Sequence, residues 1–128
     1  MVILTDTNII IEHLRVEKKE TTTFHKLFIT ERHISAITLI TVSEIWQGRS
    51  MEESKNRRIV EELLLGLQII VPNLDIAKKA GDLMRESNYR LNFPDGNIAA
   101  CAIYYNLPLL SKNKKDFAGI KGLRVYSY

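Results

Sequence analysis

The chain has 128 residues, 45% of them hydrophobic, which suits one packed domain over residues 1–128 and excludes a disordered chain. The net charge of +3 is compatible with a polyanionic partner but does not require one. A single cysteine, Cys101, excludes an internal disulfide and a cysteine-based zinc site, and no apolar stretch reaches the roughly 20 residues of a membrane span. We therefore expect a cytoplasmic protein with a buried, reduced cysteine and no contact with membranes.

Strand-like and helix-like patterns alternate along the sequence. In chain order, the predicted elements are a strand at residues 2–5, helices at 9–15 and 21–31, a strand at 34–38, helices at 41–47 and 51–67, a strand at 68–71, helices at 75–89 and 95–105, and strands at 109–111 and 124–126. Asp75 is the expected N-cap of the helix that it begins. The alternation favours an α/β fold with a mostly parallel sheet of about five strands and helices on both faces.

Four acidic residues lie where a predicted strand gives way to a helix or a loop: Asp6, Glu44, Asp95 and Asp116. Because the carboxyl ends of parallel strands face one crevice, acids that are distant in sequence can meet there. Carboxylates that meet repel one another unless a cation lies among them. Oxygen ligands of this kind suit Mg²⁺ or Mn²⁺, which support phosphodiester hydrolysis. The pattern therefore predicts a metal-dependent site that acts on phosphodiesters.

Each of these acids also has a purely structural interpretation. Asp6 and Asp95 could cap the helices that follow them. Thr41 and Glu44 fit a capping box, in which the glutamate reaches back to the threonine backbone. Asp116 could be an ordinary loop residue. Because all four acids fall near strand ends or in the first helical turns that follow, the joint pattern favours the functional interpretation.

The chain resembles the PIN-domain ribonucleases, and at this length the VapC-type toxins of toxin–antitoxin pairs. The segments that carry the resemblance are Asp6-Thr7-Asn8, Glu44, Asp95-Gly96-Asn97-Ile98-Ala99-Ala100 and Asn113-Lys114-Lys115-Asp116-Phe117. The resemblance implies a PIN-like three-layer fold and an endoribonuclease that needs Mg²⁺ or Mn²⁺ and cleaves RNA. It also implies a homodimer and a small VapB-type antitoxin whose tail blocks the cleft.

The same resemblance assigns roles to individual residues. The metal would be held by Asp6, Glu44, Asp95 and Asp116. Carboxylates or water would be oriented by Asn8, Ser111 and Asn113. Ser111 stands where the family usually has threonine, and Asn97 stands where it often has an apolar residue. Basic residues near these segments are candidate RNA contacts: Arg15, Arg49, Lys112, Lys114 and Lys115.

Other interpretations remain open at the level of sequence. A haloacid-dehalogenase-like phosphatase is disfavoured because Asn8 replaces the second acid that such enzymes need. A receiver domain is disfavoured because no aspartate ends the third predicted strand. A housekeeping RNA-processing nuclease of the same family, or a module that binds RNA or protein without cleaving it, would have the same fold. Trp46, close to Glu44, could stack on a base or pack in the core or at a dimer contact.

Overall fold

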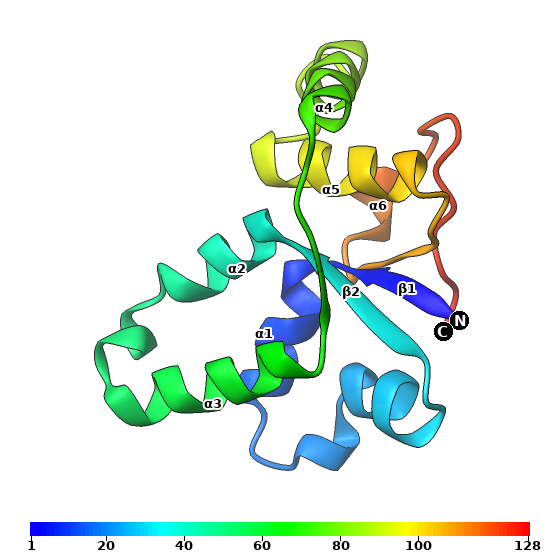
Figure 1. Cartoon of the computed structure of the whole chain (residues 1–128). Coiled ribbons are helices and arrows are strands. Elements are labelled where there is room, and N and C mark those ends of the chain that lie inside the picture. The colour runs from blue at the N-terminus through cyan, green and yellow to red at the C-terminus, as the bar shows by residue number, and fades with distance from the viewer.

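The computed structural model describes residues 1–128 and contains one parallel sheet in the order β3-β2-β1-β4 (Figure 1). The strands are β1 (Val2–Thr5), β2 (Ile34–Thr38), β3 (Gln68–Ile70) and β4 (Leu109–Leu110). The sheet has 4 strands, so the expected number of about five is slightly too high. In the predicted strand at residues 124–126, only Val125 pairs, through an isolated bridge to Leu109.

Helices connect and cover the strands. They are α1 (Thr7–Arg15), η1 (Lys19–Thr21), η2 (His25–Thr30), α2 (Leu39–Trp46), η3 (Arg49–Glu52), α3 (Ser54–Leu65), α4 (Leu74–Glu86), α5 (Phe93–Tyr104) and α6 (Lys114–Phe117). The helix predicted over 51–67 is interrupted at Glu53, whose backbone is extended. The helix predicted over 21–31 is replaced by η1 and the π-helical η2, which are joined at Thr22, where the backbone is again extended.

Both faces of the sheet are buried. Successive side chains of a strand point to opposite faces, and in β1 Ile3 and Leu4 belong to different hydrophobic clusters. Leu4 packs in the cluster that contains the residues of α4 and α5, whereas Ile3 packs in the cluster of α1, α2 and α3. Figure 1 shows these two groups of helices on opposite sides of the strands. This arrangement confirms the predicted α/β fold with helices on both faces.

The direction in which successive strands are added to the sheet reverses at β1. The chain runs from β1 outward through β2 to β3 and then returns to β4 on the other side of β1. In an open parallel sheet, the crevice outside the carboxyl ends of the strands at such a reversal is the usual place for a ligand. Asp6 and Ser111, which follow β1 and β4, lie at this edge.

Helix α5 packs closely on α4, and a glycine allows the close approach. A Cβ atom on Gly96 would lie 2.8 Å from Cγ of Met84, so even alanine at this position would force Met84 to move. Helix α4 itself begins after Asn73, whose side chain accepts a hydrogen bond from Ile76 N at 2.9 Å. The prediction of Asp75 as N-cap is therefore wrong by two residues. No helix has both the length and the apolar character needed to cross a membrane.

Candidate active site

Asp6 lies directly after β1, at the point where α1 begins. The residue is buried, with 4% of its surface exposed. Its Oδ1 accepts a hydrogen bond from the backbone N–H of Thr7 at 2.8 Å, and its Oδ2 accepts one from the hydroxyl of Ser111 at 2.6 Å. The pairing of β1 with β4 brings Ser111 to this position. Asp6 is therefore the N-cap of α1, as the structural interpretation predicts, but the cap uses only one of its two oxygens.

Glu44 is held by a neighbouring helix and not by a capping box. The hydroxyl of Thr7 donates to Oε1 of Glu44 at 2.6 Å. Because the single hydrogen of Thr7 is used there, the hydroxyl of Thr41, 2.9 Å away, donates to Thr7. The predicted capping box is wrong because α2 begins as soon as β2 ends, and Thr38 caps it by accepting from Ile40 N and Thr41 N.

Asp95 lies in the first turn of α5, but it is not the N-cap. Asn92 has that role and accepts a hydrogen bond from the backbone N–H of Asp95 at 2.9 Å. The half-buried carboxylate of Asp95 accepts no hydrogen bond from a protein group. Burial, followed by the negative charges of Asp6, Asp116 and Glu44, raises the pKa of Asp95 to about 6. The acid is therefore uncompensated.

Asp116 is carried by α6, in a segment that the sequence suggests is a loop. Phe117, 1% exposed, anchors this short helix in the core. Asp116 is half-buried, and its charge helps to raise the pKa of both Asp6 and Asp95. It therefore faces the same crevice as the other acids.

The four acids interact through their charges. Burial is the main cause that raises the pKa of Asp6, and the charges of Glu44 and Asp116 raise it further, while hydrogen bonds from Ser111 and Thr7 lower it. None of the four acids forms an ion pair with a lysine or arginine. Segments far apart in sequence thus create one region of uncompensated negative charge at the carboxyl edge of the sheet.

The chemistry of this donor set fits a hard divalent cation, although the side chains are not gathered into a ready-made metal site. No group of three or more His, Cys, Asp or Glu side chains is arranged closely enough to hold an ion. All four acids offer oxygen ligands, and their mutual repulsion is relieved by a cation placed among them.

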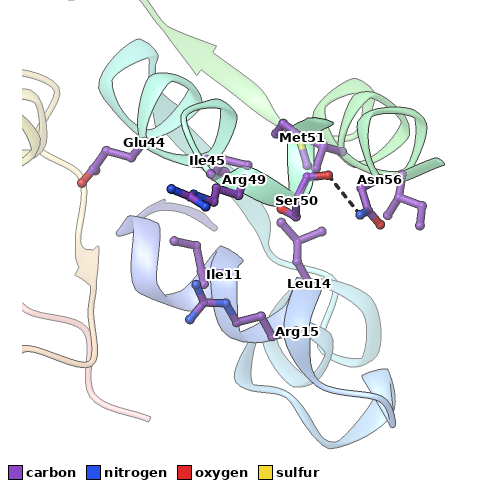
Figure 2. A pocket seen from close by; sticks show the side chains of 12 residues that line it. Ile11, Leu14, Arg15, Glu44, Ile45, Arg49, Ser50, Met51 and Asn56 are labelled. Carbon is purple, nitrogen blue, oxygen red and sulfur yellow. Dashed lines mark hydrogen bonds between the residues drawn. The ribbon is translucent and has the colours of Figure 1, made fainter. Parts of the chain in front are cut away.

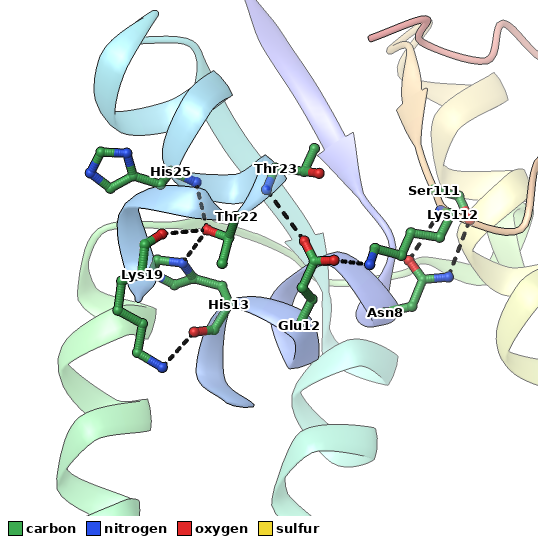
Figure 3. Close-up of polar contacts among 9 residues, drawn as sticks. All are labelled: Asn8, Glu12, His13, Lys19, Thr22, Thr23, His25, Ser111 and Lys112. Atoms are coloured by element: carbon green, nitrogen blue, oxygen red, sulfur yellow. Dashed lines mark hydrogen bonds and ion pairs between the residues drawn. The ribbon is translucent and has the colours of Figure 1, made fainter. Parts of the chain in front are cut away.

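The loop after β4 is tied to α1. The fully buried hydroxyl of Ser111 donates to Asp6 and accepts from the backbone N–H of Asn113 at 3.0 Å. Asn8 accepts from the backbone N–H of Lys112 at 3.3 Å, and its amide lies 3.5 Å from the Ser111 hydroxyl (Figure 3). Ser111 thus contacts an acid directly, Asn8 holds the loop, and Asn113 takes part through its backbone.

The predicted basic residues of this loop have different environments. Lys112 is ion-paired with Glu12 of α1, which also accepts from the backbone N–H of Thr23 at 3.3 Å (Figure 3). The ammonium of Lys114 lies over the ring of Tyr128, 4.6 Å from its centroid. Lys115 is exposed and makes no ion pair. Lys112 is thus engaged within the chain, whereas Lys115 is free to meet an anion.

A pocket of about 400 Å³ opens between α1 and the segment from α2 to α3 (Figure 2). Arg15 and Arg49 line it together with Glu44, above an apolar floor that includes Ile11 and Leu14. The two arginines and Glu44 therefore border one pocket, although α1 and the segment after α2 are distant in sequence. Helical spacing of Ile11 and Leu14 signals an apolar face, but it does not show that the face borders an open pocket.

Two further predictions concern residues near the acids. Asn97 is 5% exposed and donates to the backbone carbonyl of Phe93 at 2.9 Å, so its side chain bonds to its own helix. Trp46 is 38% exposed, so its side chain is not buried in the core of this chain. Sequence reasoning missed the part played by Thr7, whose hydroxyl joins Glu44 to the start of α1. The only signal in the sequence was its position directly after Asp6.

Comparison with known proteins gives a consistent result. The family model of the PIN domain matches residues 3–123. The chain is 28% identical to Ribonuclease VapC1 of Methanocaldococcus jannaschii, over 97% of this chain and 86% of that protein. A toxin–antitoxin complex from Klebsiella pneumoniae contains a chain that is 31% identical, with a TM-score of 0.75 and coverage of 98% and 99%. The DNA-bound VapBC structure from Salmonella typhimurium aligns with a TM-score of 0.80 at 23% identity, over 98% of each chain.

The fold and the crevice together define an α/β protein that places four acids at the carboxyl edge of a parallel sheet. Because the family match covers nearly the whole sequence, the chain belongs to the PIN domain family.

Proposed function

We propose that this protein is a divalent-metal-dependent endoribonuclease that hydrolyses phosphodiester bonds in RNA, as the toxin of a VapBC-type toxin–antitoxin pair. The observation that carries the proposal is that acids from four segments lie at one sheet edge without a cationic partner, where burial and the neighbouring negative charges raise the pKa of Asp6 and Asp95. The similarity to a protein named Ribonuclease VapC1 supports RNA as the substrate. The similarity to toxin–antitoxin complexes supports the biological role.

The residues that would hold Mg²⁺ or Mn²⁺ are Asp6, Glu44, Asp95 and Asp116. When bound, a divalent ion offsets the negative charge of the scissile phosphate and of the departing oxygen. Ser111 and Thr7 orient the two oxygens of Asp6, and the second hydrogen bond of Thr7 fixes one oxygen of Glu44. These neutral donors set the direction of the carboxylates without cancelling their charge, so the crevice stays attractive to a cation.

RNA would reach the crevice past exposed basic side chains. Lys114 and Lys115 lie on α6 beside Asp116, and Arg15 and Arg49 line the pocket beside Glu44. Phosphate groups interact with such cations whatever the base sequence, so these residues would supply affinity and not sequence choice.

The proposal includes two protein partners. A small VapB-type antitoxin would cover the crevice, and the pocket beside Glu44, with its apolar floor and two arginines, offers a surface for part of it. A second copy of the chain would complete a homodimer, as the family resemblance implies.

The direct test uses the purified chain, free of any antitoxin, and a fluorescently labelled single-stranded RNA. We expect cleavage with Mg²⁺ or Mn²⁺ and none after EDTA is added. Asp6→Asn and Asp95→Asn should abolish cleavage, whereas Asp82→Asn, which alters an exposed acid paired with Arg85 on α4, should leave the rate unchanged. A wild-type chain that binds RNA but never cleaves it would favour the non-catalytic binding module.

A second experiment separates the toxin from a housekeeping nuclease. Expression of the chain in its host should arrest growth, and co-expression of a small protein encoded next to it should restore growth. Growth that continues normally, with active nuclease in the extract, would favour the housekeeping role.

A further inference from the structure

Arg90 makes its hydrogen bonds to the backbone around Asp116. Its Nη1 donates to the backbone carbonyls of Lys115 and Asp116 at 2.9 and 3.0 Å, and its Nη2 donates to the carbonyl of Ala118 at 3.3 Å. Arg90 touches none of the four acidic side chains, because all of its hydrogen bonds go to backbone carbonyls. Arg90 therefore holds the position of the backbone and does not pair with a carboxylate.

Helix α6 needs such support because it is very short. It has four residues, and its N-cap Asn113 makes no side-chain capping hydrogen bond. A single helical turn is not stable by itself in water. Phe117 holds α6 from the core, and Arg90 is the only side chain that donates to its backbone carbonyls. The backbone position of Asp116 therefore depends on Arg90.

The turn that carries Arg90 is strained. Residues 87–92 connect α4 to α5, and within them Asn88 and Tyr89 both have left-handed backbones, with φ of 54° and 62°. A left-handed conformation is unfavourable for a non-glycine residue, though less so for asparagine. Tyr89 is 72% exposed, so burial of its ring does not compensate for this cost. The strain is retained in a segment that directs Arg90 towards α6.

The same turn also sets the position of a second acid. Leu91 is 1% exposed and anchors the turn in the core. Asn92 follows and caps α5 through the backbone N–H of Asp95. Six consecutive residues thus fix the backbone at Asp95 through Asn92 and at Asp116 through Arg90. These two acids lie on different helices, and the charge of Asp116 acts on Asp95.

We propose that Arg90 is a positioning residue of the acidic crevice, which holds α6 so that the carboxylate of Asp116 faces Asp95 and Asp6. This inference rests on the proposed nuclease function. An arginine suits the task because its planar fork donates several charge-assisted hydrogen bonds at once, which the compact ammonium of a lysine cannot do in the same geometry.

The test compares Arg90→Ala and Arg90→Lys with a matched control, Arg85→Ala. Arg85 lies on the last turn of α4, and its side chain pairs with Asp82 at 3.1 Å without touching α6. The measurements are kcat and KM for single-stranded RNA, and amide hydrogen exchange at residues 114–119 without metal or RNA. Because a displacement of about 1 Å can cost about a hundredfold in rate, we expect Arg90→Ala to lower kcat about ten- to a hundredfold and to change KM by less than about threefold.

Further outcomes separate positioning from general stability. Exchange at residues 114–119 should rise in Arg90→Ala, rise less in Arg90→Lys, and stay at the wild-type level in Arg85→Ala. Methylguanidinium at millimolar concentration should restore part of kcat in Arg90→Ala, whereas methylammonium should not. A kcat for Arg90→Ala within about twofold of wild type, or an equal loss in Arg85→Ala, would overturn the inference. If the wild-type chain cleaves no RNA, the proposed function fails, and unchanged exchange in Arg90→Ala then decides against the positioning role as well.

Discussion

Replacing Asp95 with asparagine should stabilise the protein at neutral pH while it removes catalysis. The pKa of Asp95 is raised from an ordinary value of 3.8 to about 6 by burial and by the charges of the other acids. Converted in full, this difference is about 3 kcal/mol of stability lost when the carboxylate is charged, and solvent screening at this half-buried side chain reduces it to about 2 kcal/mol. The substitution also removes a negative charge from the first turn of α5, which costs about 0.3–1 kcal/mol. The expected net gain at pH 7.5 is therefore about 1 kcal/mol.

The pH dependence follows from the sign of this pKa change. The pKa in the folded chain is above its unfolded value, so between the two values the folded chain binds the proton more tightly than the unfolded chain. The favourable contribution of Asp95 is complete below pH 3.8 and is lost as the pH rises through about 6. The wild-type chain should lose this contribution between about pH 4 and pH 7, whereas the asparagine variant should not.

Urea unfolding with EDTA present, at pH 4 and at pH 7.5, measures both effects. Asp75→Asn is a suitable control, because Asp75 is an exposed acid in the first turn of α4. It should lose only the small favourable interaction with the helix dipole and show no gain at pH 7.5. If Asp95→Asn is no more stable than wild type at pH 7.5, and its stability changes with pH in parallel to wild type, Asp95 does not carry uncompensated charge.

Three other changes test separate parts of the site. Thr7→Val removes the hydroxyl that donates to Glu44 and should lower the free energy of unfolding by about 1–3 kcal/mol in urea titrations. Replacing Lys114 and Lys115 with alanine should weaken RNA binding. The slope of log Kd against log salt concentration should fall by about 0.7 for each ammonium group that binds a phosphate, and an unchanged slope would show that these lysines do not contact RNA. Tyr89→Gly should raise the free energy of unfolding by up to about 1 kcal/mol in urea titrations, because glycine adopts the left-handed backbone without strain.

The strands β1 and β2 could be predicted to the residue, at 2–5 and 34–38. In both strands every residue after the first is buried, and helices cover both faces of the sheet. The segment 124–126 has a similar pattern but forms no ladder, because a strand also needs a partner with free backbone groups along its length. Only Val125 finds one, at Leu109. Composition describes the burial of a segment but not the presence of a strand beside it.

The predicted helix caps show the limit of local rules. Asp95 and Asp75 are good N-cap residues, but Asn92 and Asn73 precede them by two or three positions and take the role. Several residues that can cap a helix compete within one turn, and the point at which the preceding chain is anchored decides between them. For Asp95 this outcome matters, because its carboxylate is left without a hydrogen-bond donor and is free to face the crevice.

The four acids lie near enough to act on one another's charge, and this much could be predicted from the sequence because it follows from topology, although no three of them are close enough to hold an ion. Asp6 follows β1 directly, and Asp95 and Asp116 lie in the first turns of their helices. Glu44 lies further along α2, the helix that begins where β2 ends, and the parallel strands bring these segments to one edge. The orienting groups could not be predicted in the same way. Thr7 and Arg90 act through contacts with Glu44 and with α6 that depend on helix placement in three dimensions, and no local pattern encodes that placement.

The chain places neutral groups next to its acids and directs nearby cations elsewhere. Ser111 and Thr7 donate to Asp6 through a hydroxyl and a backbone N–H, Lys112 pairs with Glu12, and Arg90 binds backbone carbonyls. A lysine or arginine paired with one of the four acids would lower the pKa of that acid and relieve the repulsion. None of the four acids has such a partner within the chain, and the pKa of Asp95 is raised first by burial and then by the charges of the other acids. The free energy of unfolding is therefore lower than the fold alone would allow, and a cation bound from solution would raise it.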